Sequence, residues 1–174
     1  MEGYEFERIS PEELGNAMRM IGKEWMLIVT EDGERGRVNA MTASWGCMGV
    51  LWNKSICVCF IRPQRHTCGL IEREERLSFA FLGEERRDAF RLCGSKSGRD
   101  TDKLKEAGLS TERIDGVPVI REAKLNLVCR KLYADDLRES GFFDESLLSN
   151  YQNKDYHRVY VCEIETVLRQ RGTE

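Results

Sequence analysis

The feature that most limits the fold is a series of short β-favouring segments. Helical segments lie between only some of the consecutive expected strands. The expected strands are 26–30, 38–45, 55–61, 77–82, 117–120, 125–133 and 157–167. The first two, joined by the turn-rich segment EDGERGR, form an expected hairpin. A parallel sheet needs a long crossover, usually a helix, between strands. The sequence therefore predicts a mainly β fold, an antiparallel barrel of about six strands decorated by short helices.

Helices are expected at 10–21, 66–75, 84–93 and 98–107. The first begins at Ser10 with proline and two glutamates following, which is the pattern of a capping box. The third is amphipathic, with Ala89, Leu92 and Cys93 on one side and charged residues on the other. The fourth ends at Gly108, a typical helix stop.

Length and charge limit the classes of protein to consider. The 174 residues, 41% of them hydrophobic, suffice for one domain over 1–174 with a substantial core. There is no apolar run of about 18 residues and no secretory pattern in MEGYEFERIS, so we expect a cytoplasmic protein without a membrane segment. A net charge of −3 argues against nucleic acid as a partner.

Seven cysteines are spread through apolar contexts. Their odd number and the chain length favour reduced thiols used as small core residues over a disulfide framework. Cys57 and Cys59 share one face of a strand, which leaves a redox role open. A metal site is not expected, because there is no Cys-x-x-Cys and His66 and His157 are the sole histidines. The chain also lacks a dinucleotide fingerprint, a phosphate loop and a Gly-x-Ser-x-Gly elbow.

The segment NAMTASW, 39–45, combines small and hydroxylated residues within one expected strand. Small side chains at Ala40, Ala43 and Ser44 would let the backbone lie beside a flat ring, and Thr42 could form a hydrogen bond with it. A barrel strand whose interior is crowded by curvature explains the same residues. On composition alone the two interpretations stay open.

Two segments could hold an anion. IRPQRHT, 61–67, places arginines, a hydroxyl and free backbone N–H groups where a helix begins. SKSGRDTDK, 95–103, brings Lys96, Arg99 and Lys103 to a second expected helix start, where cations cost stability unless an anion compensates them. Solvated loop charges explain the first segment equally well, and a Ser97–Asp100 cap could explain the second.

Taken in order, NAMTASWGCMGVLWNK, IRPQRHT, CGSKSGRDTDKLKEAGL and DYHRVYVCEI closely resemble the flavin reductase-like, FMN-binding split-barrel family, in particular its flavoredoxin-type members. The resemblance covers 22–167 and depends on four motifs in the same order. It implies a six-stranded antiparallel Greek-key split barrel, a homodimer, and FMN bound non-covalently near the subunit interface.

The resemblance also implies roles for individual residues. The isoalloxazine-facing wall would be Asn39, Ala40, Met41, Thr42, Ala43, Ser44 and Trp45. The ribityl phosphate would be held by Arg62, Arg65, His66, Thr67, Ser97, Gly98, Arg99 and Lys103. His157 stands where related reductases carry a histidine close to flavin and nicotinamide, which makes it the catalytic candidate, although a lone histidine is more often structural. Cys162 departs from relatives that have glycine there, and either Trp45 or Trp52 could cover the ring.

The implied function is an FMN oxidoreductase, in which NADH or NADPH reduces the flavin and electrons pass to an acceptor. FMN would perform the hydride chemistry while the protein positions it, so no acid–base dyad is expected. The alternative is a flavoredoxin-like electron carrier that works with protein partners and has no nicotinamide site.

Overall fold

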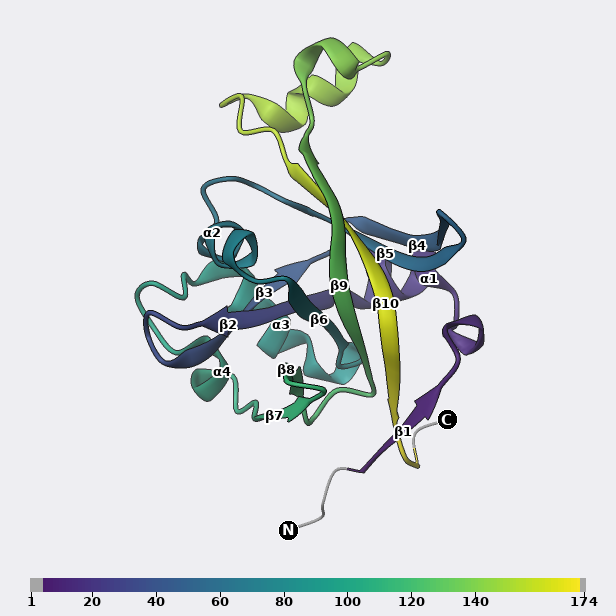
Figure 1. Cartoon of the computed structure of the whole chain (residues 1–174). Coiled ribbons are helices and arrows are strands. Elements are labelled where there is room, and N and C mark those ends of the chain that lie inside the picture. Colours follow the sequence, from purple (N-terminus) through teal and green to yellow (C-terminus); the bar gives the residue numbers. More distant parts are fainter. Residues whose placement is uncertain (1–4, 173–174) are drawn as a thin grey trace.

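A computed structural model describes residues 5–172, which form a mainly antiparallel β structure with short helices around it (Figure 1). The strands are β1 (Phe6–Ile9), β2 (Met26–Asp32), β3 (Arg37–Ala43), β4 (Gly46–Leu51), β5 (Lys54–Ile61), β6 (Arg76–Phe81), β7 (Thr111–Ile114), β8 (Val117–Ile120), β9 (Leu125–Asp136) and β10 (Arg158–Gln170). The α-helices are α1 (Ala17–Arg19), α2 (His66–Arg73), α3 (Arg87–Ser95) and α4 (Lys103–Glu106). The predicted fold class is confirmed.

The main sheet has the order β3-β2-β6-β9-β10-β5-β4, and β1 pairs with β10 as its eighth strand. Six of these strands come from segments that the sequence predicted, and the expected β2–β3 hairpin is present with Thr30 opposite Asn39. Strands β1 and β4 were not predicted. β4 is glycine-rich and largely exposed at the sheet edge, so its sequence lacks the alternation of buried and exposed residues that marks a strand.

Strands β3 and β4 are the two ends of the sheet order, yet only Ser44 and Trp45 connect them. The sheet must therefore curl until its ends approach each other, which is the geometry of a split barrel. Gly46 makes this corner possible, because a Cβ atom at that position would lie 2.6 Å from the backbone oxygen of Val58. Ser44 and Trp45 consequently lie where the two halves of the barrel meet.

Two clusters of buried side chains surround β3. One fills the barrel and includes Met41, Ala43 and Tyr160, and the other lies between the opposite face of the β2–β3 hairpin and helices α3 and α4. Ala40 belongs to this second cluster, together with Phe90 of α3. The strand that carries the predicted ring-facing residues is thus fixed on both faces.

Two helix predictions were wrong in extent. The capping box at Ser10 is confirmed, but it starts only a 3-10 turn, Pro11–Glu13, because the backbone of Leu14 is extended. A new helix, α1, begins after its N-cap residue Asn16 and continues into a π-helix, Met20–Glu24. The fourth helix is α4 alone. Asp102 caps it, whereas the hydroxyl of Ser97 accepts from the backbone N–H of Arg99 in the preceding loop.

The chain between β9 and β10 projects from the body at the end of their long ribbon (Figure 1). It contains the 3-10 helices Glu139–Gly141 and Glu145–Tyr151, which the sequence analysis did not predict. A further 3-10 turn, Glu84–Arg86, leads into α3, so the predicted helix 84–93 is confirmed with a tighter first turn.

All seven cysteines are free, and each except Cys47 is buried, so their use as small core residues is confirmed for those six. Burial raises the pKa of the Cys57 and Cys59 thiols well above the ordinary value, which suppresses the thiolate needed for redox chemistry.

Within residues 5–172, no group of three or more His, Cys, Asp or Glu side chains is placed to hold a metal ion. No helix in that range has the length and apolarity that a membrane crossing requires.

Candidate functional site

Two cavities lie side by side and share Arg65. The first, of about 240 Å³, is here called the aromatic cavity and is lined by Met41, Thr42, Ala43, Ser44, Trp45, Phe60, Arg62, Arg65 and His157. The second, also of about 240 Å³, is called the cationic cavity and is lined by Gln64, Arg65, His66, Thr67, Gly94, Ser95, Lys96, Ser97, Gly98, Arg99 and Lys103. The structure thus brings the end of β3, both cationic segments and the start of β10 together.

The end of β3 and the corner that follows form one wall of the aromatic cavity. Ala43 and Ser44 are small, while the half-exposed Trp45 contributes an indole ring. Thr42 donates its hydroxyl hydrogen to the backbone oxygen of Phe90 at 2.6 Å, which ties β3 to α3. Its oxygen can therefore accept a hydrogen bond from a ligand, but its hydrogen is already used. Trp52 does not line the cavity.

His157 lines the aromatic cavity next to Trp45. Its ring lies 5.2 Å from the Trp45 ring, centroid to centroid, and its Nδ1 lies 2.8 Å from the hydroxyl oxygen of Tyr151. The side chain is only 7% exposed. Burial, aided by the nearby Arg62, lowers the pKa of His157 to about 4, so this imidazole is neutral around pH 7.

Arg62 does not lie where the phosphate-binding prediction placed it. It lines the aromatic cavity, forms an ion pair with Asp155, and donates to the backbone oxygen of Asn150 at 2.9 Å. These contacts attach the projecting segment to the end of β5. The predicted strand does end immediately before Arg62. The residues that Arg62 contacts lie about 90 positions away in sequence, so no local pattern could have revealed them.

The cationic cavity lies at the start of α2. The N-cap residue Arg65 makes no side-chain capping bond, so the first backbone N–H groups of the helix lack a side-chain acceptor. Arg65 itself donates to the backbone oxygen of Gly94 at 3.1 Å, and burial lowers its pKa. Arg99 reaches the backbone oxygen of Gln64 at 3.4 Å from the opposite loop.

Lys103 is the least expected member of the cationic cavity, because it is a lysine with only 4% exposure. Its ammonium group donates to the backbone oxygen of Cys93 at 3.1 Å, and no carboxylate among residues 5–172 forms an ion pair with it. Burial lowers its pKa to about 8, with a further contribution from Arg65. A buried cation without a counter-charge is unfavourable unless a ligand supplies one.

Some predicted residues make contacts within the protein or lie outside the two cavities. The Nε2 atom of His66 lies 2.9 Å from the buried carboxylate of Asp32. Asn39 lines neither cavity, but its amide donates to the hydroxyl of Thr67 at 2.9 Å. Ala40 also lines neither cavity, because its side chain faces α3.

Gly98 approaches Asn39 so closely that a Cβ atom would lie 2.1 Å from the Asn39 Oδ1 atom and 3.1 Å from Cδ2 of His66. Because Asn39 is buried and bonded to Thr67, it cannot easily move aside. We expect Gly98→Ala to lower the free energy of unfolding by about 1–3 kcal/mol in a urea titration. Gly69→Ala is the matched control, since nothing lies near that position in α2. Equal loss in both variants would contradict this packing.

Sequence reasoning did not select several lining residues. Phe60 lies in a strand with apolar residues on both faces, so its sequence does not show which side chains reach the cavity. Gly94 and Ser95 lie inside the motif CGSKSGRDTDKLKEAGL, and their position next to Lys96 and Ser97 was the signal that could have identified them as lining residues. Nothing local marked Tyr151, which lines neither cavity but contacts His157.

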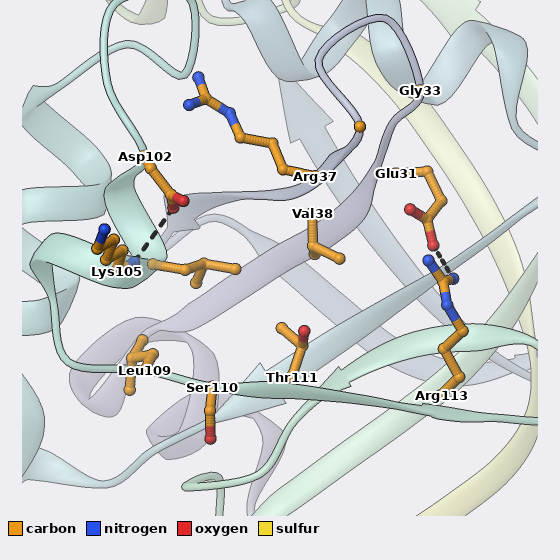
Figure 2. Close-up of a pocket in the computed structure, with 12 residues that line it drawn as sticks. Glu31, Gly33, Arg37, Val38, Asp102, Lys105, Leu109, Ser110, Thr111 and Arg113 are labelled. Atoms are coloured by element: carbon orange, nitrogen blue, oxygen red, sulfur yellow. Dashed lines mark hydrogen bonds and ion pairs between the residues drawn. The ribbon is translucent and has the colours of Figure 1, made fainter.

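A third cavity of about 570 Å³ lies between the β2–β3 hairpin and the α4–β7 region (Figure 2). Two of its lining residues are acidic. Glu31 pairs with Arg113, and Asp102 accepts from the backbone N–H of Lys105. It is the larger space, but it contains none of the predicted site residues and no buried unpaired cation. The two smaller cavities are therefore the better candidate site.

A model of the flavin reductase like domain family matches residues 18–173. No match to a curated protein was found. Similar solved structures include an FMN-binding domain of a flavin reductases-like enzyme from Shewanella baltica OS155, with 14% identity, a TM-score of 0.69, and coverage of 97% of this chain and 79% of that chain.

Two further structures are an FMN-binding protein from Thermus thermophilus with bound p-hydroxybenzaldehyde and a flavoredoxin from Methanosarcina acetivorans. The first has 23% identity, a TM-score of 0.65, and coverage of 85% of this chain and 72% of that one. The second has 20% identity, a TM-score of 0.65, and coverage of 85% and 69%. Such identities establish likeness of fold. Because the family model spans nearly the whole chain, the protein belongs to the flavin reductase like domain family.

Proposed function

We propose that this protein is an FMN-binding oxidoreductase, in which electrons pass from NADH or NADPH through FMN to an acceptor. The observation that carries this proposal is Lys103, a buried cation that pairs with no carboxylate of residues 5–172, in a cavity that adjoins an aromatic-lined cavity through Arg65. A molecule with a flat ring at one end and a phosphate at the other matches both cavities. Flavin mononucleotide has that form.

The residues present fit the two ends of FMN. Lys103, Arg65 and Arg99, with the uncapped start of α2, would hold the phosphate. The wall formed by Ala43 and Ser44 would lie along the ring, since small side chains allow close approach of the backbone. When bound, FMN would supply the capacity to accept a hydride and to pass electrons on singly or in pairs.

The remaining residues would control the surroundings of the ring. Trp45 lines the aromatic cavity and would cover part of the ring against water. His157 is neutral near pH 7, so the ring nitrogen that Tyr151 does not contact would offer one hydrogen-bonding group to the site without adding a charge. In the proposed function His157 touches the cofactor or the nicotinamide and is the catalytic candidate.

We propose further that the protein works as a cytoplasmic homodimer. Exposed apolar side chains gather on and near β4, where Val50 is 77% exposed and the rings of Trp52 and Tyr133 lie 6.5 Å apart. Such a patch on an edge strand is typical of a surface that a second copy covers. Sedimentation equilibrium giving the 20.1 kDa mass of one chain would contradict the dimer.

The proposed function is tested by purifying the protein, adding FMN, and recording its visible spectrum without air during addition of NADH or NADPH. We expect a flavin band that bleaches within a catalytic turnover time. Bleaching by dithionite or a reduced partner protein, but by neither nicotinamide, would favour a flavoredoxin-like carrier instead. A colourless protein that ignores added FMN would contradict both functions.

A further inference from the structure

The hydroxyl group of Tyr151 reaches the catalytic candidate from outside the cavity. Its oxygen lies 2.8 Å from Nδ1 of His157, while Tyr151 itself does not line the aromatic cavity. The imidazole therefore has two different sides. Nδ1 faces the tyrosine, and Nε2 has no hydrogen-bond partner among residues 5–172, so it is the nitrogen available to a ligand in the cavity that His157 lines.

The hydrogen bond between these groups can run in two directions. If Tyr151 donates to Nδ1, every polar hydrogen of the pair has an acceptor except the Nε2–H group, which is free for a ligand. If Nδ1–H donates instead, the tyrosine hydrogen is left over, and within residues 5–172 no other acceptor contacts it. An unsatisfied hydroxyl costs free energy at a side chain that is 7% exposed. The first arrangement is therefore favoured.

The position of Tyr151 is held by the residues around it. The guanidinium of Arg62 lies 5.3 Å above its ring, and the rings of Phe142 and Tyr156 lie 5.7 Å and 5.0 Å away. Backbone hydrogen bonds fix both residues as well: the N–H of Lys154 donates to the backbone oxygen of Tyr151, and the N–H of Leu137 donates to the backbone oxygen of His157, each at 2.9 Å. Tyr151 and His157 thus form one rigid unit.

The charged groups near His157 favour its neutral form. Arg62, from the end of β5, opposes a positive charge on the imidazole, while Asp155 from the projecting segment is paired with Arg62 and compensates only partly. Tyr151 adds an O–H group that binds the unprotonated Nδ1. All three groups act on the same ring, but only Tyr151 distinguishes its two nitrogens.

We propose that Tyr151 is a positioning residue that holds His157 as the neutral Nε2–H tautomer, so that this histidine donates a hydrogen bond into the aromatic cavity. The cavity then selects ligands that present an acceptor, such as a ring carbonyl or ring nitrogen, to that side. The effect on turnover rests on the proposed function, whereas the tautomer itself is a property of the ligand-free protein.

The tautomer is tested by long-range proton–nitrogen NMR on protein with ¹⁵N-labelled histidine, with His157→Asn to assign the signals. In the ligand-free parent we expect Nδ1 in the unprotonated range and Nε2 in the protonated range. Tyr151→Phe keeps the ring and removes the hydroxyl, so both tautomers should become populated and the pKa of His157 should rise. Tyr156→Phe is the matched control, because its hydroxyl contacts Glu139 at the surface.

The second measurement is steady-state turnover with FMN bound. Tyr151→Phe should lower kcat by about tenfold with little change in KM for the nicotinamide, and Tyr156→Phe should match the parent. A proton on Nδ1 in the parent, or identical spectra for the parent and Tyr151→Phe, would overturn the tautomer assignment even if FMN does not bind. An altered tautomer with unchanged kcat would overturn its role in turnover.

Discussion

Replacing Ala43 with leucine is expected to give a protein that folds but remains colourless when FMN is added. Ala43 lies at the end of β3, lines the aromatic cavity and is nearly buried. The substitution replaces a methyl group by an isobutyl group in a cavity of about 240 Å³, where a planar ring is proposed to lie against the strand. We expect the dissociation constant for FMN to rise by about 100-fold or more, because the ring and the side chain compete for the same space.

Flavin fluorescence titration measures this loss, and Ala43→Ser is the matched control because it keeps the small size. Ala43 also touches the buried cluster inside the barrel, so the unfolding transition of each ligand-free variant should be recorded. A leucine variant that unfolds like the parent but no longer binds FMN supports the ring assignment. One that is as yellow as the parent removes Ala43 from the flavin wall.

Much of the architecture follows from local pattern. The hairpin of β2 and β3, the strands β5, β6, β9 and β10, and the helix α2 are visible as β-favouring runs or helical segments between turn residues. β4 was missed because its side chains are exposed at an edge, and its pairing with β5 depends on a tight turn at Trp52 and Asn53. The periodicity of buried residues cannot reveal a strand that buries almost none.

The candidate site was predictable where its residues are contiguous in sequence. The loop around Ser97–Gly98 and the start of α2 do share one cavity, as the resemblance implied. Arg62, which the prediction assigned to the phosphate, lines the other cavity, because its partners lie about 90 residues away in the chain. Tyr151 was not predicted, because it lies in a segment without a recognisable motif. Ala40 shows a different limit. Residues 41–45 line the aromatic cavity, but the side chain of Ala40 packs in the buried cluster on the α3 side of the strand.

Replacing Lys103 with methionine is expected to weaken FMN binding by about 10- to 100-fold while leaving riboflavin binding unchanged. Riboflavin lacks the phosphate, so it does not need the ammonium group, whereas a charge-assisted hydrogen bond to phosphate is worth about 1.5–3 kcal/mol. Methionine keeps an unbranched side chain of similar length in the buried position. The ligand-free variant should also be more stable than the parent, because a buried charge without a counter-ion is removed.

The pH dependence provides an independent check. Burial lowers the pKa of Lys103 to about 8, below its unfolded value of 10.5, so the folded protein loses this proton first as the pH rises. Between these values the Lys103 side chain binds more protons in the unfolded chain, so the free energy of unfolding of the ligand-free parent, measured relative to Lys103→Met, should increase with pH. The buried cysteines, whose pKa values are raised, act in the opposite direction in both proteins and cancel in this difference. FMN affinity should fall over the same range, because the deprotonated amine no longer attracts phosphate. The fall in FMN affinity should be absent in Lys103→Met.

Lys105→Met is the matched control, since Lys105 lies on the same short helix but is exposed and lines the third cavity. It should bind FMN as the parent does and keep both pH trends. If the two lysine variants bound FMN equally well, the phosphate would have to lie elsewhere, and the burial of Lys103 would need another explanation. If only Lys103→Met lost the preference for FMN over riboflavin, the cationic cavity would be the phosphate site, since no other change separates the two variants.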